Sequence, residues 1–283
     1  MAELWKGAPA AAALMEDLTG RIERLSGAGV TPTLAIVRVG ERPDDRAYET
    51  GAVKRCEKAG VAVKRFPLPA GCSALELRAV LEHINAVSEI HGCLMLRPLP
   101  DPAMEEMACA LLDPKKDVDC MTPTALAGVF AGKGWGYPPC TAQACLELLK
   151  YYKTALTGKR AVVVGRSLVI GKPVSMLLQA ENATVTMCHT RTVDLPAVCR
   201  GAEVLIAAAG RANLLGAAHV SPGQVVLDVG INVDKDGKLC GDVKFDEAEP
   251  VVSAITPVPG GVGAVTTAVL VKHVVEAAER TLK

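Results

Sequence analysis

The chain has 283 residues, which is enough for one large or two medium domains, and half of them are hydrophobic, so a substantial core can be buried. Its 31 acidic and 31 basic side chains balance without an evident basic stripe, so we expect no nucleic-acid partner. The longest apolar runs are too short to span a bilayer, so we expect no membrane association.

In the first half of the chain, apolar runs of strand length alternate with helical patterns. Strands are predicted at Thr33–Val39, Val61–Leu68 and Ile90–Leu96. Helices are predicted over Asp44–Ala59, from Ser73 onward and over Met104–Leu112. The second of these helices begins with a capping box, because Glu76 lies three residues after Ser73. The segment Arg97–Pro102 contains three prolines and is predicted to be a rigid loop.

The second half begins after Gly132–Pro139, which is rich in Gly and Pro and where we place a domain boundary. We expect one domain over residues 1–139 and another over 140–265, with a helix over 266–283 that packs back on the first. Further helices are predicted at Thr141–Tyr152 and Pro173–Gln179, and strands at Ala161–Val164, Thr184–Met187, Val204–Ala208 and Val225–Val229. The alternation predicts an α/β protein with two α/β domains, parallel sheets and a cleft between the domains.

The ten cysteines have irregular spacings and form no CxxC pair, so we expect no metal site. The N-terminal segment Met1–Met15 is rich in Ala but carries Glu3 and Lys6 and shows no clear cleavage pattern. We therefore expect reduced, partly buried thiols in a cytoplasmic protein.

A nucleotide site is predicted where the strand Ala161–Val164 runs through Gly165 and Gly171 to Pro173. The two glycines allow a tight turn and a close backbone approach, and a helix start offers free N–H groups to a phosphate. The pattern is not GxGxxG, so an ordinary strand-to-helix turn would explain it equally well.

The next strand, Thr184–Met187, indicates which nicotinamide nucleotide is bound. A site that prefers NAD places an acid after this strand to hold the ribose hydroxyls. Here the strand is followed by Thr190, Arg191 and Thr192, with Arg166 in the first loop. Hydroxyls and cations suit a 2′-phosphate, so the pattern favours NADP, although Thr190 and Arg191 could simply cap a loop.

Several strings resemble one family, the bifunctional methylenetetrahydrofolate dehydrogenase/cyclohydrolases. They are Gly165-Arg166-Ser167 with Gly171 and Pro173, Cys188-His189-Thr190, Asp228-Val229-Gly230-Ile231-Asn232 and Thr256-Pro257-Val258-Pro259-Gly260-Gly261-Val262-Gly263. The resemblance extends to Tyr48, the Pro98–Pro100 loop, Lys116–Asp119 and Pro139–Thr141 in the first half. It therefore covers nearly the whole chain, and the Thr256–Gly263 string is highly specific.

The resemblance implies a two-domain fold with a Rossmann-type NADP domain, and a tetrahydrofolate derivative as substrate in one-carbon metabolism and purine biosynthesis. It implies that the cofactor is held by Gly165, Arg166, Ser167, Thr190 and Ile231. It implies that the folate is held by Tyr48, Asp119, Pro259, Gly260, Gly261, Val262, Gly263 and Thr266, with Tyr48 and Asp119 as the catalytic positions. The ring of Tyr48 can stack on the folate, and the carboxylate of Asp119 can accept two N–H donors of the pterin edge. The plainer alternatives are that Tyr48 is a helix-surface residue and that Asp119 caps a loop. The family is commonly homodimeric, so a homodimer is also implied.

The chain departs from the family at two positions. The family has lysine four residues after the tyrosine, where this chain has Ala52. It has glutamine directly before the proline-rich loop, where this chain has Leu96. Lys54 and Arg55 are nearby cations, but neither keeps the four-residue spacing that places two side chains on one helix face.

These departures bear on the two activities unequally. Hydride transfer mainly needs two bound molecules to be positioned, whereas hydrolysis needs a general acid or base, typically worth ~10²–10⁴-fold. We therefore expect an NADP-dependent dehydrogenase whose cyclohydrolase is weak or lost. One alternative keeps both activities, with Lys54 or Arg55 rearranged into the site. Another is a silent folate- or NADP-binding protein, which is suggested by Ala264-Val265 where the family has Pro-Met. An unrelated Rossmann dehydrogenase is hard to reconcile with the Thr256–Gly263 string.

Overall fold

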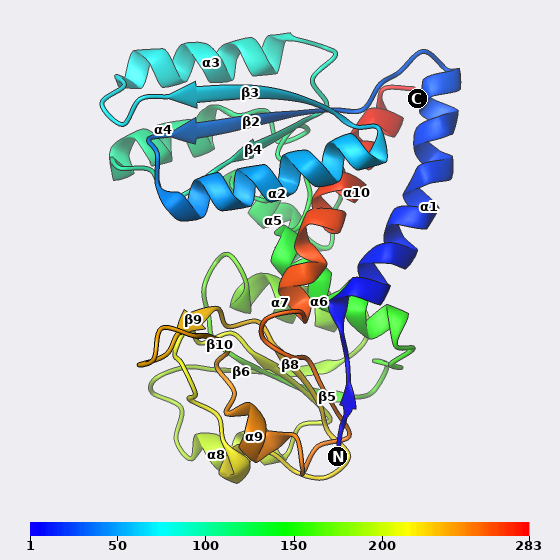
Figure 1. Ribbon diagram of the computed structural model, residues 1–283, viewed down its shortest axis with the longest axis vertical. Helices are drawn as coiled ribbons and strands as arrows, with labels where there is room; N and C mark the ends of the chain where they lie inside the picture. Colours follow the sequence, from blue (N-terminus) through cyan, green and yellow to red (C-terminus); the bar gives the residue numbers. More distant parts are fainter. Residues whose placement is uncertain (283) are drawn as a thin grey trace. The chain divides into compact units, whose positions relative to one another are not determined.

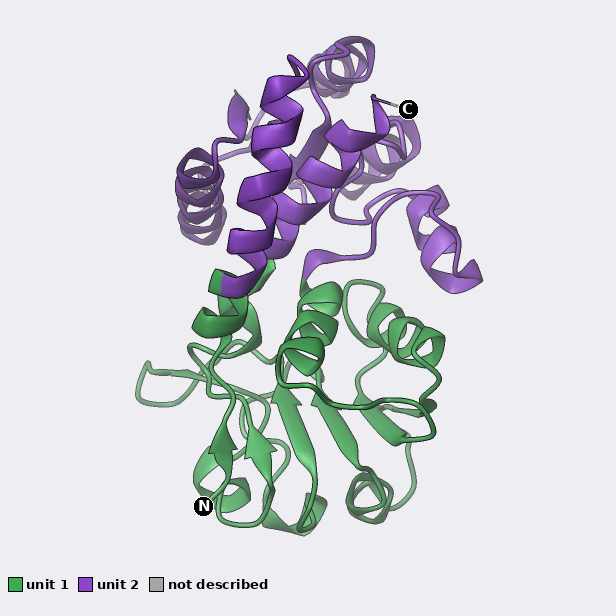
Figure 2. Cartoon of the chain, turned by 90° about the vertical axis from the view of Figure 1, so that its right-hand side faces the viewer, with its two compact units in different colours: residues 1–12, 141–266 green, residues 13–140, 267–283 purple. Residues whose placement is uncertain are grey.

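The computed structural model describes residues 1–282 and divides into two compact units, which are coloured separately in Figure 2. Unit 1 comprises Met1–Ala12 and Thr141–Thr266, and unit 2 comprises Ala13–Cys140 and the chain from Thr267 onward. The N-terminal segment differs from the expected division, because residues 1–12 belong with the later part of the chain. Within residues 1–282, no helix has both the length and the apolar character needed to cross a membrane.

Unit 1 is built on a six-stranded sheet in which every neighbouring pair is parallel. Its strands, in spatial order, are β1 (Glu3–Leu4), β11 (Ala254–Ile255), β8 (Val225–Asp228), β7 (Val204–Ala207), β5 (Arg160–Val164) and β6 (Thr184–Cys188). The central strands β5, β7 and β8 are apolar except for Arg160 at the start of β5 and Asp228 at the end of β8, as parallel strands covered on both faces require. The chain proceeds from β5 to β6 on one side and then to β7 on the other, which makes the carboxyl end of β5 a topological switch point.

The first twelve residues join unit 1 through contacts that are remote in sequence. In β1, Glu3 pairs with Ala254 and Leu4 with Ile255. Trp5 stacks on Tyr152, with ring centroids 4.4 Å apart and planes 4° from parallel. These contacts explain why the N-terminal segment does not follow the domain that comes next in the sequence.

The remaining elements of unit 1 are short. They are α6 (Cys140–Tyr151, which begins at the last residue of unit 2), α7 (Gly171–Ala180), α8 (Leu195–Arg200), α9 (Phe245–Ala248), the hairpin β9 (Asn232–Val233) and β10 (Leu239–Cys240), and the 3₁₀ turns η1 (Ala217–His219) and η2 (Val262–Ala264). The helix α7 begins at Gly171, directly after the loop that follows β5, and this arrangement places a helix N-terminus at the switch point.

Unit 2 contains a three-stranded parallel sheet in the order β3 (Ala62–Leu68), β2 (Thr33–Val39) and β4 (Gly92–Met95) (Figure 1). All seven residues of β2 are buried, since it is the central strand. One face of the sheet packs on α3 (Ala74–Ala86) and α4 (Pro102–Leu111) through a single apolar cluster. The other helices are α1 (Gly7–Gly27, which begins in unit 1), α2 (Pro43–Ala59), α5 (Pro123–Ala131) and α10 (Thr266–Arg280).

Local signals in the sequence place the ends of the unit 2 helices. Ser73 and Glu76 form the predicted capping box at the start of α3. Gly60 ends α2 with a left-handed φ of 84°, a conformation that glycine adopts without strain. The expected α/β class with parallel sheets is confirmed in both units.

Candidate functional site

The loop between β5 and α7 is the first part of the candidate site, and two glycines shape it. Gly165 has φ 137°, and a Cβ added to it would lie 2.1 Å from the carbonyl oxygen of Ala208. A Cβ on Gly171 would lie 2.3 Å from the carbonyl oxygen of Gly165. Backbone therefore packs on backbone at both positions, and no residue with a side chain fits without displacing the loop.

Ser167 organises the same loop. Its hydroxyl oxygen accepts hydrogen bonds from the backbone N–H groups of Ile170 (3.1 Å) and Gly171 (3.4 Å). Because a serine hydroxyl also carries one proton, Ser167 can still donate to an anionic ligand. The loop thus offers a hydroxyl donor next to a helix N-terminus, an arrangement that suits a phosphate.

A pocket of about 460 Å³ lies at the carboxyl ends of β5, β6 and β7. Four predicted cofactor residues, Gly165, Arg166, Ser167 and Thr190, are among those that line it. Sequence reasoning missed Arg211, which follows β7 and lines the same pocket, because an arginine in a polar loop carries no local signal of its neighbours. Arg191 lies outside the lining, is exposed, and donates its backbone N–H to His189 Nδ1 (3.1 Å).

The charge of this pocket fits NADP. Its described lining contains two arginines, one histidine, two threonines and a serine, and none of the residues in that lining is acidic. An acid that would hold the ribose hydroxyls of NAD and repel a 2′-phosphate is therefore missing from the lining. The groups that would hold the cofactor phosphates, including the 2′-phosphate, are Arg166, Arg211, Ser167 and Thr190.

A second pocket in unit 1, of about 290 Å³, collects the other predicted residues of this unit. Ile231 and the segment Pro259–Gly263 line it, together with Asp228 and Leu239 among others. Gly260 has φ 101°, and a Cβ on Gly261 would lie 2.6 Å from the carbonyl oxygen of Pro257. Backbone is thereby held at the surface of this pocket, as close approach to a flat ligand requires.

Two side chains at the edge of this second pocket have defined roles. Thr266 is buried and donates its hydroxyl to the carbonyl oxygen of Gly263 (2.9 Å), so it fixes the start of α10 and is not among the described lining residues. Burial raises the pKa of the Asp228 carboxyl to about 6, against the effect of three backbone N–H groups that donate to it. Asp228 is therefore the titratable group of this pocket.

In unit 2, the structure brings Tyr48 and Asp119 together. Tyr48 is half-buried on α2, and burial followed by the negative charge of Asp119 raises the pKa of its hydroxyl well above the usual range. The Asp119 carboxylate accepts the backbone N–H of Cys140 (2.8 Å). Burial raises the pKa of Asp119, while the Cys140 contact and the charge of Arg97 lower it. A ring that could stack and a carboxylate with spare acceptor capacity are thus close enough to interact electrostatically.

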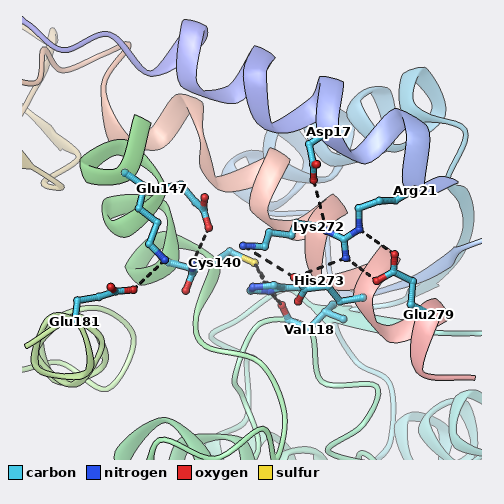
Figure 3. A network of polar contacts seen from close by, with 12 residues as sticks. Asp17, Arg21, Val118, Cys140, Glu147, Glu181, Lys272, His273 and Glu279 are labelled. Atoms are coloured by element: carbon cyan, nitrogen blue, oxygen red, sulfur yellow. Dashed lines mark hydrogen bonds and ion pairs between the residues drawn. The ribbon is translucent and has the colours of Figure 1, made fainter. Parts of the chain in front are cut away.

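The loop that carries Asp119 is held from both sides. The buried carboxylate of Asp117 accepts the backbone N–H groups of Met121 (3.0 Å) and Thr122 (2.7 Å) and the Thr122 hydroxyl (2.7 Å). His273 of α10 contacts the carbonyl oxygen of Val118 through Nδ1 (2.9 Å), as Figure 3 shows. Because a carbonyl only accepts, this nitrogen carries a proton. The Asp119 loop is therefore rigidly placed.

The two departures from the family are apolar and buried. Ala52 has no exposed surface and Leu96 is 6% exposed. Lys54 is exposed and lines a separate pocket on the outer side of α2 with Arg38, Arg46 and Arg65, among others. It lies six residues after Tyr48, which is about 240° around the helix. Arg55 Nε donates to the Thr267 hydroxyl (3.3 Å). Neither cation occupies the position that a lysine at residue 52 would take.

Two protein-family models match the chain. One describes the catalytic domain of tetrahydrofolate dehydrogenase/cyclohydrolase and covers residues 5–119. The other describes the NAD(P)-binding domain of the same enzymes and covers residues 139–282. This second match confirms the expected nicotinamide-nucleotide domain, and both agree with the resemblance seen in the motifs.

Relatives match over the whole length. The bifunctional protein FolD of Carboxydothermus hydrogenoformans is 52% identical over 99% of this chain and 98% of its own. The bifunctional protein FolD 1 of Desulfitobacterium hafniense is 46% identical over 98% of this chain and 99% of its own.

Solved structures give the same result. The bifunctional FolD of Campylobacter jejuni has a TM-score of 0.93 at 35% identity and covers 99% of this chain and 100% of its own. The methylenetetrahydrofolate dehydrogenase-cyclohydrolase of Trypanosoma brucei, solved with NADP and an inhibitor, has a TM-score of 0.92 at 32% identity and covers 100% of this chain and 99% of its own. The names of these proteins favour two activities over the reduced cyclohydrolase that Ala52 and Leu96 led us to expect.

Proposed function

Because the chain belongs to the tetrahydrofolate dehydrogenase/cyclohydrolase family, we propose that it oxidises 5,10-methylenetetrahydrofolate to 5,10-methenyltetrahydrofolate with NADP and then hydrolyses the methenyl product. The observation that carries the proposal is the acid-free pocket at the ends of β5, β6 and β7. It supplies two arginines and three hydroxyls to a phosphorylated nucleotide, beside a loop that tolerates no side chain at Gly165 or Gly171.

In the first reaction, NADP when bound accepts the hydride that leaves the one-carbon bridge of the folate. The folate's own nitrogen stabilises the resulting cation, so the task of the protein is to position both molecules. We assign the stacking contact with the aminobenzoyl ring to Tyr48 and the hydrogen bonds to the pterin edge to Asp119. We assign close backbone contacts with a flat ligand to Pro259–Gly263 of unit 1.

In the second reaction, water adds to the methenyl carbon and loses a proton, and a carbon–nitrogen bond opens as its nitrogen gains one. Ala52 and Leu96 contribute no polar group to this step. Tyr48 and Asp119 are the titratable side chains among the unit 2 residues that are expected to hold the folate. Because Asp119 is assigned to the pterin edge, we propose that the Tyr48 hydroxyl orients the water.

A second candidate function is a dehydrogenase whose cyclohydrolase is weak. Its support is that both positions of the family's polar pair are buried and apolar. A third possibility, rearrangement of Lys54 or Arg55 into the site, is tested by Lys54→Ala and Arg55→Ala. It requires either substitution to abolish hydrolysis, whereas we expect Lys54→Ala to leave it unchanged.

The direct test of the first reaction is NADPH formation by purified protein with methylenetetrahydrofolate, compared between NADP and NAD. We expect folate-dependent NADPH formation and a higher kcat/KM with NADP. Binding of both ligands without hydride transfer would instead identify a silent binding protein. A higher kcat/KM with NAD would overturn the cofactor assignment.

The homodimer and the role in purine biosynthesis remain predictions of the resemblance, and the cytoplasmic location remains a prediction from the cysteines and the N-terminal segment. Size-exclusion chromatography with light scattering would test the first of them: a mass near 29.5 kDa would identify a monomer and contradict it.

A further inference from the structure

Asp242, which follows β10 in unit 1, gathers hydrogen bonds from a turn far away in sequence. Its side chain has no exposed surface. Oδ2 accepts the backbone N–H groups of Ala209 (2.5 Å) and Gly210 (2.9 Å), and Oδ1 accepts that of Arg211 (2.8 Å). The Asn232 side-chain amide also donates to Oδ1 (2.9 Å). A single carboxylate thus receives three consecutive backbone N–H groups and one amide.

Such a run of converging N–H groups is an arrangement that commonly binds an anion. Gly210 has φ 65°, a left-handed conformation that turns its N–H toward the same point as its neighbours. Here the protein's own carboxylate occupies that point. A bound phosphate must therefore be held in this region by side chains, and Arg211 is the cation that this turn carries.

Neighbouring groups hold the backbone of Asp242 and pack closely around its carboxylate. Its backbone N–H donates to Asp228 Oδ1 (3.0 Å). A Cβ added to Gly230 would lie 2.4 Å from Asp242 Oδ1, and one added to Gly241 would lie 1.9 Å from Asp228 Oδ2. Gly230 and Gly241 have no side chain, so the two buried acids can approach the backbone this closely. Asp242 is thereby held in the position from which it binds the Ala209–Arg211 turn.

The turn forms part of the nucleotide pocket. Ala208, Ala209 and Arg211 line it on the side of β7, and Thr190 lines it after β6. The residue after the second strand of such a sheet faces the adenosine ribose, so a cation in the same pocket lies where an NADP 2′-phosphate must be accommodated.

We propose that Asp242 is a positioning residue that fixes the Ala209–Arg211 turn, and that Arg211 thereby joins Arg166 in recognising the 2′-phosphate of the cofactor. The inference rests on the proposed use of NADP. It assigns cofactor selectivity to a residue of the β7 loop, and to a buried acid that does not line the pocket.

The conservative substitution Asp242→Asn isolates this role. An amide has one acceptor oxygen, so whichever way it is oriented, its NH₂ group faces donors that the carboxylate accepted. The side chain then loses two of its four hydrogen bonds, and at least one of the two comes from the turn, although the volume is unchanged. Arg211→Leu removes the cation and leaves Asp242 in place.

The experiment is isothermal titration of the purified full chain with 2′,5′-ADP and with 5′-AMP, which differ in the 2′-phosphate. We expect Arg211→Leu and Asp242→Asn each to weaken 2′,5′-ADP binding by about tenfold or more and 5′-AMP binding much less. The double variant should bind 2′,5′-ADP no more weakly than Arg211→Leu, because Asp242 acts through Arg211. Lys235→Leu removes an exposed cation from the β9–β10 hairpin and should change neither affinity.

The outcomes separate the possibilities. Unchanged 2′,5′-ADP binding in Arg211→Leu overturns the inference, and equal weakening of both nucleotides in Asp242→Asn shows a merely structural acid and overturns the positioning role. If the wild type binds neither nucleotide, the proposed NADP function fails with it. Should Asp242→Asn not fold, Arg211→Leu alone still decides whether the cation reads the 2′-phosphate.

Discussion

The pocket of unit 1 proposed to bind NADP and the residues of unit 2 proposed to bind folate differ in how completely they keep the functional groups of their family. The pocket retains its tight glycines, its hydroxyls and its cations, and its described lining has no acid. Unit 2 keeps Tyr48 and Asp119, whose charges interact, but Ala52 and Leu96 replace a polar pair. The difference teaches that hydride transfer depends on binding two molecules well, whereas hydrolysis depends on a few polar side chains that can be exchanged.

The largest expected effect is in the nucleotide pocket. Gly165→Ala places a Cβ 2.1 Å from a backbone oxygen in a conformation that alanine rarely adopts, so the loop must move. We expect NADP binding to weaken by more than about 100-fold, measured by titration calorimetry. Gly134→Ala is the matched control, since nothing lies within 4 Å of its added Cβ and its φ is not left-handed. Normal NADP binding by Gly165→Ala would show that this loop is not the phosphate site.

In unit 2, Asp119→Ala removes the carboxylate that is proposed to hold the pterin edge. We expect kcat/KM for methylenetetrahydrofolate to fall by about 10- to 100-fold, as the loss of charge-assisted hydrogen bonds predicts, while NADP binding is unchanged. Steady-state kinetics with each ligand varied in turn measures both. A loss of NADP affinity equal to the loss of folate affinity would contradict the assignment of Asp119 to the folate.

Restoring the polar pair sharpens the contrast between the two reactions. Ala52→Lys combined with Leu96→Gln should raise hydrolysis of methenyltetrahydrofolate by up to about 100-fold and leave NADPH formation nearly unchanged. Both positions are buried, so a lower unfolding temperature is expected from the desolvated charge. Each single substitution is a control, because only the pair restores both partners. An unaltered hydrolysis rate in a folded double variant would show that position 52 does not govern the second reaction.

The last prediction concerns stability, not activity, and follows from the pKa of Asp228. Its folded pKa of about 6 lies above its ordinary value of 3.8, so the folded protein binds this proton more tightly than the unfolded chain. The free energy of unfolding should therefore rise, by up to about 3 kcal/mol from this group, as the pH falls from about 6 to about 4. Asp228→Asn lacks this gain. The free energy of unfolding of the wild type, measured with urea, should therefore exceed that of the variant by more at about pH 4 than at pH 7.

Asp236→Asn is the control for that comparison, because Asp236 is exposed in the β9–β10 hairpin. Its difference from the wild type should stay constant with pH. A constant difference for Asp228→Asn as well would mean that the proton is not bound more tightly on folding.

Features set by neighbouring residues were predictable from the sequence. The strand over Thr33–Val39, the capping box at Ser73 and the loop from Gly165 to Gly171 each depend on a local pattern. The helices α1 and α5 were not predicted. The Ala-rich start of α1 is a local helix signal, because alanine favours helix strongly.

Features set by distant residues could not be predicted in the same way. Glu3 pairs with Ala254, which assigns the N-terminus to unit 1. Asp242 accepts hydrogen bonds from residues about 30 positions earlier, and Arg211 lines the nucleotide pocket only because β7 lies next to β5. No local pattern distinguishes these residues from other loop acids and cations.

The rate at which the purified wild type consumes methenyltetrahydrofolate, relative to buffer alone, tests the central claim most directly. The account predicts consumption above the uncatalysed rate, even though Ala52 and Leu96 replace the family's polar pair, and predicts that Asp119→Ala removes the excess. Consumption equal to that in buffer, in protein that still forms NADPH, would contradict it and leave a dehydrogenase alone.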